Sequence, residues 1–147
     1  MAADIIDSSV LARVYLPDEH GHAEAVALLE DAEAATVTGT WTRVEASGTL
    51  VRAARHGRGD EVGILRALDA DLGPHGPVTV LTAPQTAIED GALELVRRHG
   101  LRAMDAWHLS LERLVLPDLV ENGEQLAFAA RDERQAEVAQ ELGFVCV

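Results

Sequence analysis

Short apolar runs alternate along the chain with longer segments whose apolar residues recur at helical spacing. The short runs are predicted as strands over 3–7, 35–38, 78–81, 125–130 and 144–147. The longer segments are predicted as helices over 8–15, 22–34, 42–56, 60–72, 84–99, 104–116 and 132–142. Strands that alternate with helices in this way are typical of an α/β domain with a mostly parallel sheet. No internal linker is long enough to divide the chain, so we expect a single domain over 1–147.

The predicted helix over 42–56 carries two distinct stripes of side chains. We expect a small, mostly apolar stripe to face the core, made of Val44, Ser47, Val51 and Ala54. A separate polar stripe carries Glu45, Thr49, Arg52 and His56. Near the other end of the chain, Pro117 is expected to end a helix, and a loop is predicted over 117–124.

Charge narrows the functions that this composition allows. The 147 residues include 25 acidic and 12 basic side chains, all of the basic ones arginine, for a net charge of −13. A field of that sign repels phosphate backbones at long range, which excludes a general duplex-binding protein. Aromatic residues make up 3%, too few for the stacking platforms that hold single-stranded nucleic acid on a sheet. Contact with nucleic acid therefore requires a local site, with metal ions to reverse the local charge.

Other features of the composition favour a cytoplasmic protein. The single cysteine, Cys146, has no partner for an internal disulfide, and its apolar neighbours predict a buried strand residue. No apolar stretch of the sequence approaches the roughly 18 residues of a membrane span. The first nine residues lack the basic and apolar segments of a signal peptide.

Four carboxylates lie at junctions between the predicted strands and helices. They are Asp7 at the end of the first strand, Glu45 and Asp105 at the start of the third and sixth helices, and Asp132 after the fourth strand. Because the carboxyl ends of parallel strands form one crevice, we expect these side chains to meet there. The same residues also suit helix capping, since Asp is a favoured N-cap and Thr42 with Glu45 matches a capping box. Spacing alone therefore supports either an acidic cleft or a set of caps.

The residues around these carboxylates resemble, in order, the landmarks of one family. The matching segments are Asp7-Ser8-Ser9-Val10-Leu11, Thr42-Arg43-Val44-Glu45, Arg102-Ala103-Met104-Asp105-Ala106-Trp107-His108-Leu109 and Phe128-Ala129-Ala130-Arg131-Asp132. Together they resemble the PIN-domain nucleases, and most closely the small stand-alone VapC-like toxins. The resemblance runs from Ile5 to the terminal Gly143-Phe144-Val145 strand. It implies a three-layer α/β/α sandwich with a mostly parallel central sheet.

The resemblance also implies a metal site. Asp7, Glu45, Asp105 and Asp132 match the family's acidic quartet, and Ser9 matches its serine or threonine just beyond the first aspartate. The implied cofactor is Mg²⁺ or Mn²⁺, which binds carboxylate oxygens and activates water. The three aspartates are then expected as direct or water-mediated ligands, and Glu45 as a ligand or as the group that orients the attacking water. Ser9 is expected to hold a carboxylate or a phosphate oxygen.

The chain departs from the family at three positions near this site. Trp107 stands where an aliphatic residue is usual, Met104 where alanine or proline is frequent, and Ala130 where threonine or another polar residue is frequent. These differences alter packing more than ligands, and Trp107 is placed to narrow or reshape the cleft. His108 lies one helical turn beyond Asp105, and we expect it to pack or to form a hydrogen bond rather than to catalyse.

Arginines gather near the acidic residues. Five arginines against three carboxylates lie within 43–66, and three more arginines precede Asp105. We expect Arg43, Arg52, Arg55 and Arg102 to flank the cleft and hold an RNA backbone. The alternative is that they lie on ordinary solvated helix faces, or complement a helix dipole.

By resemblance, the chain is expected to be a metal-dependent endoribonuclease that acts as the toxin of a toxin–antitoxin pair. The implied partners are an inhibitory antitoxin that is a small DNA-binding protein, the RNA substrate and a second copy of the chain, with no membrane. The competing interpretation is a non-catalytic interaction module whose acidic residues serve as caps. A phosphatase of the haloacid-dehalogenase type is disfavoured, because Asp4 and Asp7 lie three residues apart and that class needs Asp-x-Asp.

Overall fold

A parallel sheet forms the centre of the computed structural model, which describes residues 2–115, 126–129 and 133–146. The sheet has five strands in the order β3-β2-β1-β4-β5. All neighbouring strands are parallel, which confirms the predicted mostly parallel sheet. The strands are β1 (Ala2–Ile6), β2 (Ala34–Gly39), β3 (Val78–Leu81), β4 (Leu126–Ala129) and β5 (Val145–Cys146).

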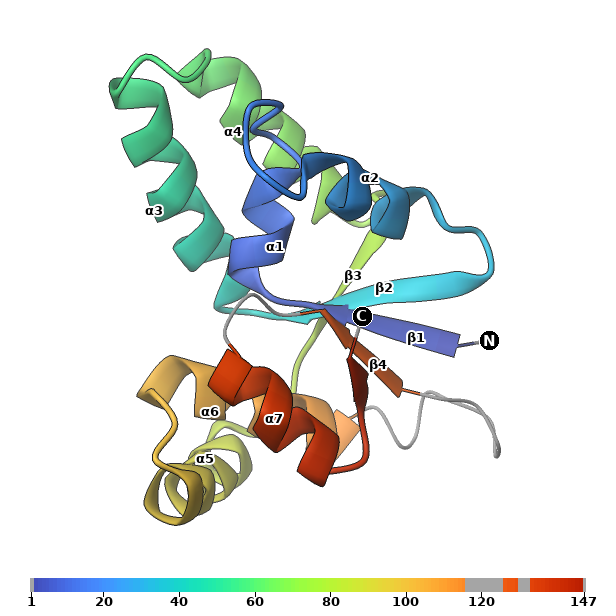
Figure 1. Cartoon of the computed structure of the whole chain (residues 1–147), viewed down its shortest axis with the longest axis vertical. Coiled ribbons are helices and arrows are strands. Elements are labelled where there is room, and N and C mark those ends of the chain that lie inside the picture. Colours follow the sequence, from blue (N-terminus) through green and yellow to red (C-terminus); the bar gives the residue numbers. More distant parts are fainter. Residues whose placement is uncertain (1, 116–125, 130–132, 147) are drawn as a thin grey trace.

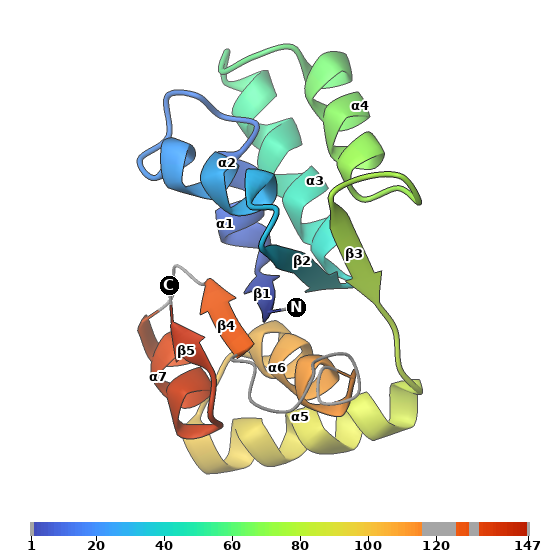
Figure 2. The ribbon, with the colours of Figure 1, turned by 90° about the vertical axis from the view of Figure 1, so that its right-hand side faces the viewer.

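Helices cover both faces of this sheet. Helices α1 to α4 lie on one face and α5 to α7 on the other, as the two views in Figures 1 and 2 show. The three-layer α/β/α sandwich is therefore confirmed. The helices are α1 (Ser8–Arg13), α2 (His22–Glu30), α3 (Thr42–Arg55), α4 (Glu61–Asp71), α5 (Gln85–His99), α6 (Ala103–Val115) and α7 (Glu133–Glu141).

Two apolar cores fill the space between the three layers. Successive residues of a strand point to opposite faces, and β1 supplies one isoleucine to each core. Ile6 packs with Leu11 and Leu50 on the side of α1 to α4. Ile5 packs with Leu109 on the side of α5 to α7. Because both faces of β1 are buried, its carboxyl end is held in a fixed position between the two layers of helices.

The order of the strands places a crevice beside β1. The chain builds outward from β1 through β2 to β3 and then returns to the other side of β1 with β4. Ligands of open parallel sheets bind outside the carboxyl ends of the strands at such a reversal. The residue that leaves β1 at this point is Asp7.

Two local predictions are wrong. Helix α2 ends at Glu30 rather than at 34, because the Asp31 side chain accepts a hydrogen bond from the Glu33 amide and forms a turn before β2. The buried stripe of α3 is not the predicted one, since Val44 is exposed. Small apolar residues occur on both sides of α3, so periodicity alone did not select the inner face. The residues of α3 that are buried are Thr42, Ala46, Leu50 and Ala53.

The remaining boundaries fall within a few residues of their predicted positions. Gly100 ends α5 in the left-handed conformation, with φ of 68°, as its position after the last turn predicts. The loop predicted over 117–124 lies outside the described residues. Within the described ranges, no helix is long and apolar enough to cross a membrane.

Candidate active site

Asp7 occupies the carboxyl end of β1 and begins α1. Its Oδ1 accepts hydrogen bonds from the Val10 amide at 3.0 Å and from the Ser9 hydroxyl at 2.8 Å. The residue is therefore a true N-cap, as the capping interpretation predicts. It is also only 8% exposed, and burial raises the pKa of its carboxyl while the two hydrogen bonds lower it. A buried carboxyl fixed by two donors is suited to present its other oxygen to a ligand.

Glu45 lies in the first turn of α3, but it does not cap that helix. The N-cap of α3 is Trp41, without a side-chain hydrogen bond, so the predicted capping box is wrong. The Thr42 hydroxyl lies 2.7 Å from Thr38 Oγ1 instead. Thr38 donates its own proton to the Ile6 carbonyl, so Thr42 is the donor between the two hydroxyls.

His108 of α6 holds the carboxylate of Glu45. Its Nε2 lies 2.5 Å from Glu45 Oε1, and the imidazole is 3% exposed. This contact confirms the hydrogen-bonding prediction for His108. Both residues act on Asp7, because the charge of Glu45 raises the pKa of Asp7 and His108 lowers it. Elements far apart in the sequence thus bring Asp7, Glu45 and His108 together.

Gly39 at the end of β2 makes this arrangement possible. A Cβ at this position would lie 2.8 Å from His108 Nδ1 and 3.0 Å from Leu111 Cδ2. Helix α6 therefore approaches β2 more closely than any side chain there would allow. The close approach brings His108 within reach of Glu45.

Glu112 is a candidate site residue that the sequence analysis missed. It is 1% exposed on α6, and its Oε2 has no hydrogen-bond partner among the described residues. Burial raises its pKa well above the usual value, and the negative charge of Asp7 raises it further. Helical side chains lean toward the N-terminus of their helix, which directs this carboxyl toward the end of α6 that carries His108. The available signal was the spacing of Asp105, His108 and Glu112, which share one face of α6.

The other acidic residues of the predicted quartet have different outcomes. Asp105 is half-buried in the first turn of α6, which begins at Ala103, so it is not the N-cap. It lies on the same helix face as His108 and has interactions of its own. Asp132 lies outside the described residues.

The chemistry of these donors fits a hard divalent cation. Asp7 and Glu45 offer carboxylate oxygens, and Glu112 adds a buried oxygen that nothing described satisfies. Mg²⁺ and Mn²⁺ prefer such oxygen ligands and retain several waters. In the part of the chain that the structure describes, no three acidic or histidine side chains converge closely enough to form a complete ligand set.

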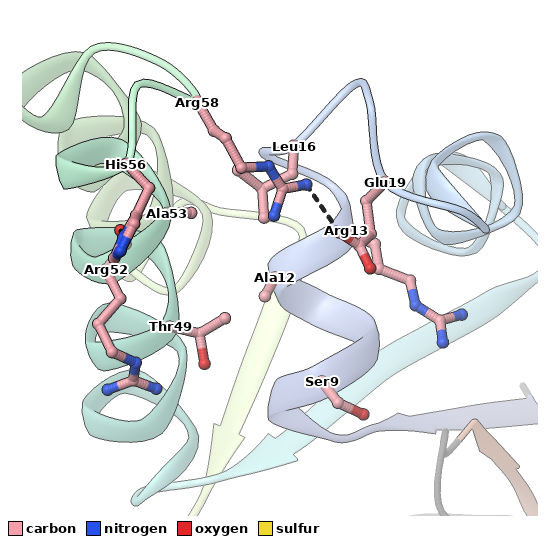
Figure 3. Close-up of a pocket in the computed structure, with 10 residues that line it drawn as sticks. All are labelled: Ser9, Ala12, Arg13, Leu16, Glu19, Thr49, Arg52, Ala53, His56 and Arg58. Carbon is pink, nitrogen blue, oxygen red and sulfur yellow. Dashed lines mark hydrogen bonds and ion pairs between the residues drawn. The ribbon is translucent and has the colours of Figure 1, made fainter.

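A groove of about 450 Å³ runs away from this site between α1 and α3. Ser9 and Thr49 line it near the sheet, and Arg52 lies at the same end, as Figure 3 shows. Farther along the groove, Arg58 is engaged by Asp18 and Glu19 at 2.8 and 2.7 Å. Three residues of the polar stripe predicted for α3, namely Thr49, Arg52 and His56, therefore line an open groove.

The four arginines predicted to hold RNA occupy unlike positions. Arg43 and Arg55 form exposed ion pairs with Asp69 and Glu61. Arg52 lines the groove, and no ion pair of its guanidinium occurs among the described residues. Arg102 is exposed immediately before α6. The geometry thus favours Arg52 over Arg43 and Arg55 as a phosphate ligand.

We compared the chain with protein families, curated sequences and solved structures. A family model for the PIN domain matches residues 5–141. No curated protein sequence matches the chain.

Solved structures share the fold, among them the following three. PAE2754 of Pyrobaculum aerophilum aligns with a TM-score of 0.59 and 19% identity, over 99% of this chain and 84% of that one. FitAcB of Neisseria gonorrhoeae aligns with a TM-score of 0.55 and 16% identity, over 97% and 95%. A toxin–antitoxin complex of Klebsiella pneumoniae aligns with a TM-score of 0.51 and 15% identity, over 88% and 87%. Because the family model covers most of the sequence, this chain belongs to the PIN domain family.

Proposed function

We propose that this protein is a metal-dependent endoribonuclease and the toxin of a toxin–antitoxin pair. The observation that carries the proposal is the cluster of Asp7, Glu45 and His108 at the carboxyl end of β1, in a chain of the PIN domain family. Hydrolysis of a phosphodiester bond needs an activated water and positive charge near the phosphate, and a bound Mg²⁺ or Mn²⁺ supplies both.

The residues of the chain would bind the metal ion, orient its ligands and hold the RNA. Asp7, held by Ser9 and the Val10 amide, presents a fixed carboxylate to the ion. Glu45, oriented by His108, serves as a further ligand or holds the attacking water. Asp105 and Asp132 are proposed as the remaining direct or water-mediated ligands. Ser9 keeps the Asp7 carboxylate in place, and Arg52, with Arg102, contacts the RNA backbone.

Glu112 has a supporting role in this proposal. Its buried carboxyl is close enough to Asp7 for that charge to raise its pKa, and its Oε2 has no hydrogen-bond partner among the described residues. When the site holds a divalent cation, the negative charges of Asp7 and Glu112 are compensated, which removes the main cost of keeping both buried. We therefore place Glu112 as a positioning residue that favours the loaded site over the empty one.

The proposed toxin role rests on the similarity to a solved toxin–antitoxin complex and on the net charge of the chain. One structural neighbour is a toxin–antitoxin complex. An active ribonuclease harms its own cell, so an inhibitor must accompany it, and a net charge of −13 complements a basic antitoxin tail. We propose a small DNA-binding antitoxin, a homodimer and a cytoplasmic site of action. If the product of a neighbouring co-expressed gene neither co-purifies with the protein nor inhibits it, the toxin assignment fails.

Cleavage of a mixed RNA pool by purified, antitoxin-free protein tests the activity. We expect cleavage with Mn²⁺ or Mg²⁺, loss of cleavage in EDTA and loss in Asp7→Asn, which keeps the N-cap but removes the charge. Asp60→Asn is the matched control, because Asp60 caps α4 by accepting the Gly63 amide at 2.8 Å on an exposed surface. Cleavage that survives in Asp7→Asn, or that is absent from the folded wild type, contradicts the proposal.

The second candidate function is a non-catalytic interaction module. The cap formed by Asp7 favours it, since that aspartate has a structural task without any metal. In that case Asp7 and Asp60 are equivalent caps, and the protein binds no divalent cation. Calorimetric titration with Mn²⁺ separates the two candidates.

A further inference from the structure

A second cavity, of about 400 Å³, opens at the carboxyl edge of the sheet beside the acidic site. Its apolar wall contains Trp41, Trp107 and the buried Ile88. Exposed polar side chains also line it, among them Thr40, Thr82 and Gln85. We call it the two-tryptophan pocket, since Trp41 and Trp107 are the only tryptophans of the chain.

The two indole rings form an edge-to-face pair. Their centroids lie 6.4 Å apart with an interplanar angle of 90°. Trp41 is nevertheless 46% exposed, in a chain with 3% aromatic residues. A large aromatic surface left in water loses the free energy that burial would gain, so its exposure beside a cavity indicates a ligand that covers it.

The pocket is directly connected to the acidic site. The Trp107 ring packs edge-to-face against His108, with centroids 5.4 Å apart. His108 in turn lies 2.5 Å from Glu45. A ligand on the tryptophans therefore lies next to the imidazole that contacts the Glu45 carboxylate of the acidic site.

The residues that line the two-tryptophan pocket indicate which kind of ligand it can bind. No arginine or histidine lines the pocket in the described part of the chain, which disfavours a phosphate there. Its one charged lining residue among those described is Glu89, and that carboxylate already accepts a hydrogen bond from Gln85 at 2.6 Å. Indole faces with hydroxyl and amide groups around them suit a flat, neutral, π-rich group with polar edges. An unstacked nucleobase has this chemistry.

We propose that the two-tryptophan pocket binds one unpaired base of single-stranded RNA next to the phosphate that is cleaved. This inference rests on the proposed ribonuclease function and adds a base-recognition subsite to it. Stacking on Trp41 supplies affinity, and the polar groups around the rings discriminate among bases. The subsite restricts cleavage to single-stranded segments, because a paired base is not available to enter it.

Intrinsic fluorescence tests the subsite without a label, because both tryptophans of the chain line the pocket. The intact wild-type protein is titrated in EDTA with single-stranded hexamers of each of the four ribonucleotides. The Asp7→Asn variant, which lacks one acidic charge of the site, is titrated in the same way. We expect saturable quenching that is strongest for one homopolymer and absent for a duplex of the same length.

Substitutions then assign the signal to the rings. Trp41→Ala should weaken binding about tenfold or more, since stacking of one base on an aromatic ring has an effect of this order. Trp41→Phe should retain most of the affinity, and Val62→Ala, which truncates an exposed apolar residue on α4, should leave it unchanged. For the alanine variant the binding is followed by anisotropy of an end-labelled hexamer.

Several results overturn the inference. They are equal quenching by the duplex, equal affinity of Trp41→Ala and wild type, and no quenching in either titration. Protection of the tryptophans from acrylamide that grows with protein concentration also overturns it, because a second copy then covers the pocket. Failure of the ribonuclease proposal is distinguishable: the hexamers bind and quench, but the wild type with Mn²⁺ cleaves no RNA.

Discussion

The contact between His108 and Glu45 fixes one carboxylate of the site to the opposite layer of helices. The imidazole of His108 is buried. Among the described residues, its Nε2 is the hydrogen-bonding partner of Glu45 Oε1. Groups that orient a metal-binding or water-binding carboxylate affect catalysis strongly without touching the substrate.

Replacing His108 tests this role. We expect His108→Leu, which cannot form the hydrogen bond, to lower kcat by about 10- to 100-fold with little change in KM. His108→Gln places an amide nitrogen near the position of Nε2 and should recover part of the loss. Steady-state cleavage of one labelled RNA measures both parameters. Equal kcat values for the leucine variant and the wild type would show that the contact is only structural.

The buried carboxyl of Glu112 should make the folded protein less stable as the pH rises. Its pKa in the folded chain is raised above 4.5 by burial and by the charge of Asp7. The folded state therefore retains a proton that the unfolded state loses, so the contribution of Glu112 to stability is greatest below pH 4.5 and is lost as the pH rises through the raised pKa.

Glu112→Gln removes this titration. We expect the variant to gain about 1–3 kcal/mol in free energy of unfolding at pH 7.5 over the wild type, and much less at pH 4. Urea unfolding at the two pH values measures the difference. Glu24→Gln, an exposed position on α2, is the control. A Glu112→Gln variant that is less stable than wild type at pH 7.5, without metal, contradicts this account of the burial.

At the scale of helices and strands, the close contact of α6 with β2 determines the geometry of the site. In Gly39→Ala the new methyl group meets His108 and Leu111, so α6 must move outward. We expect a loss of about 1–3 kcal/mol in stability and a fall in kcat. Gly91→Ala is the matched comparison, because its Cβ would collide with Ser110 Oγ between α5 and α6.

Thermal unfolding and kcat, measured on both glycine variants, separate the two effects. Gly91→Ala should lose stability but retain kcat once the protein is folded. If the two variants lose kcat equally, then general loosening of α6, and not the position of His108, explains the result.

The order of the elements was predictable because each apolar run or helical stripe is a local signal. The position of Asp7 was also predictable, since a carboxylate that ends a strand and begins a helix lies at the carboxyl edge of the sheet. The inner face of α3 was not, because Val44 and Ala46 are both apolar and only packing against α1 and α4 distinguishes them. Glu112 was missed for a similar reason, since a glutamate in a helix is usually solvated.

The tryptophan pair shows a further limit of the sequence. Few aromatic residues argued against stacking on nucleic acid, and that argument holds for a broad platform on a sheet. It does not hold for one small pocket, because Trp41 and Trp107 come from distant segments and meet only in the fold. The composition gives the number of aromatic side chains, but it does not show whether the fold places them next to one another.

At the scale of the whole molecule, a net charge of −13 must be reconciled with an RNA substrate. The groove between α1 and α3 offers a local solution, since Arg52 lines it while Arg55 is paired with Glu61. At moderate salt, the long-range repulsion is screened beyond about 10 Å, and nearby cations dominate.

Charge reversal distinguishes the two arginines. We expect Arg52→Glu to raise KM for RNA several-fold and to reduce the salt dependence of binding by about one unit of the log–log slope. Arg55→Glu should have a smaller effect, because Arg55 lies at an existing ion pair. Binding measured by anisotropy at four salt concentrations gives both quantities. Identical salt slopes for wild type and Arg52→Glu would remove Arg52 from the RNA path.

The most direct test of the central claim is calorimetric titration of the purified, metal-free protein with Mn²⁺. The carboxylates of Asp7 and Glu45 predict saturable binding by the wild type, strongly weakened binding by Asp7→Asn, and unchanged binding by Asp60→Asn, whose aspartate caps α4. Proton release should accompany binding, because burial raises the pKa of Asp7 in the metal-free protein. If the wild type takes up no Mn²⁺, or if Asp7→Asn binds it equally well, Asp7 is a helix cap and not part of a metal site.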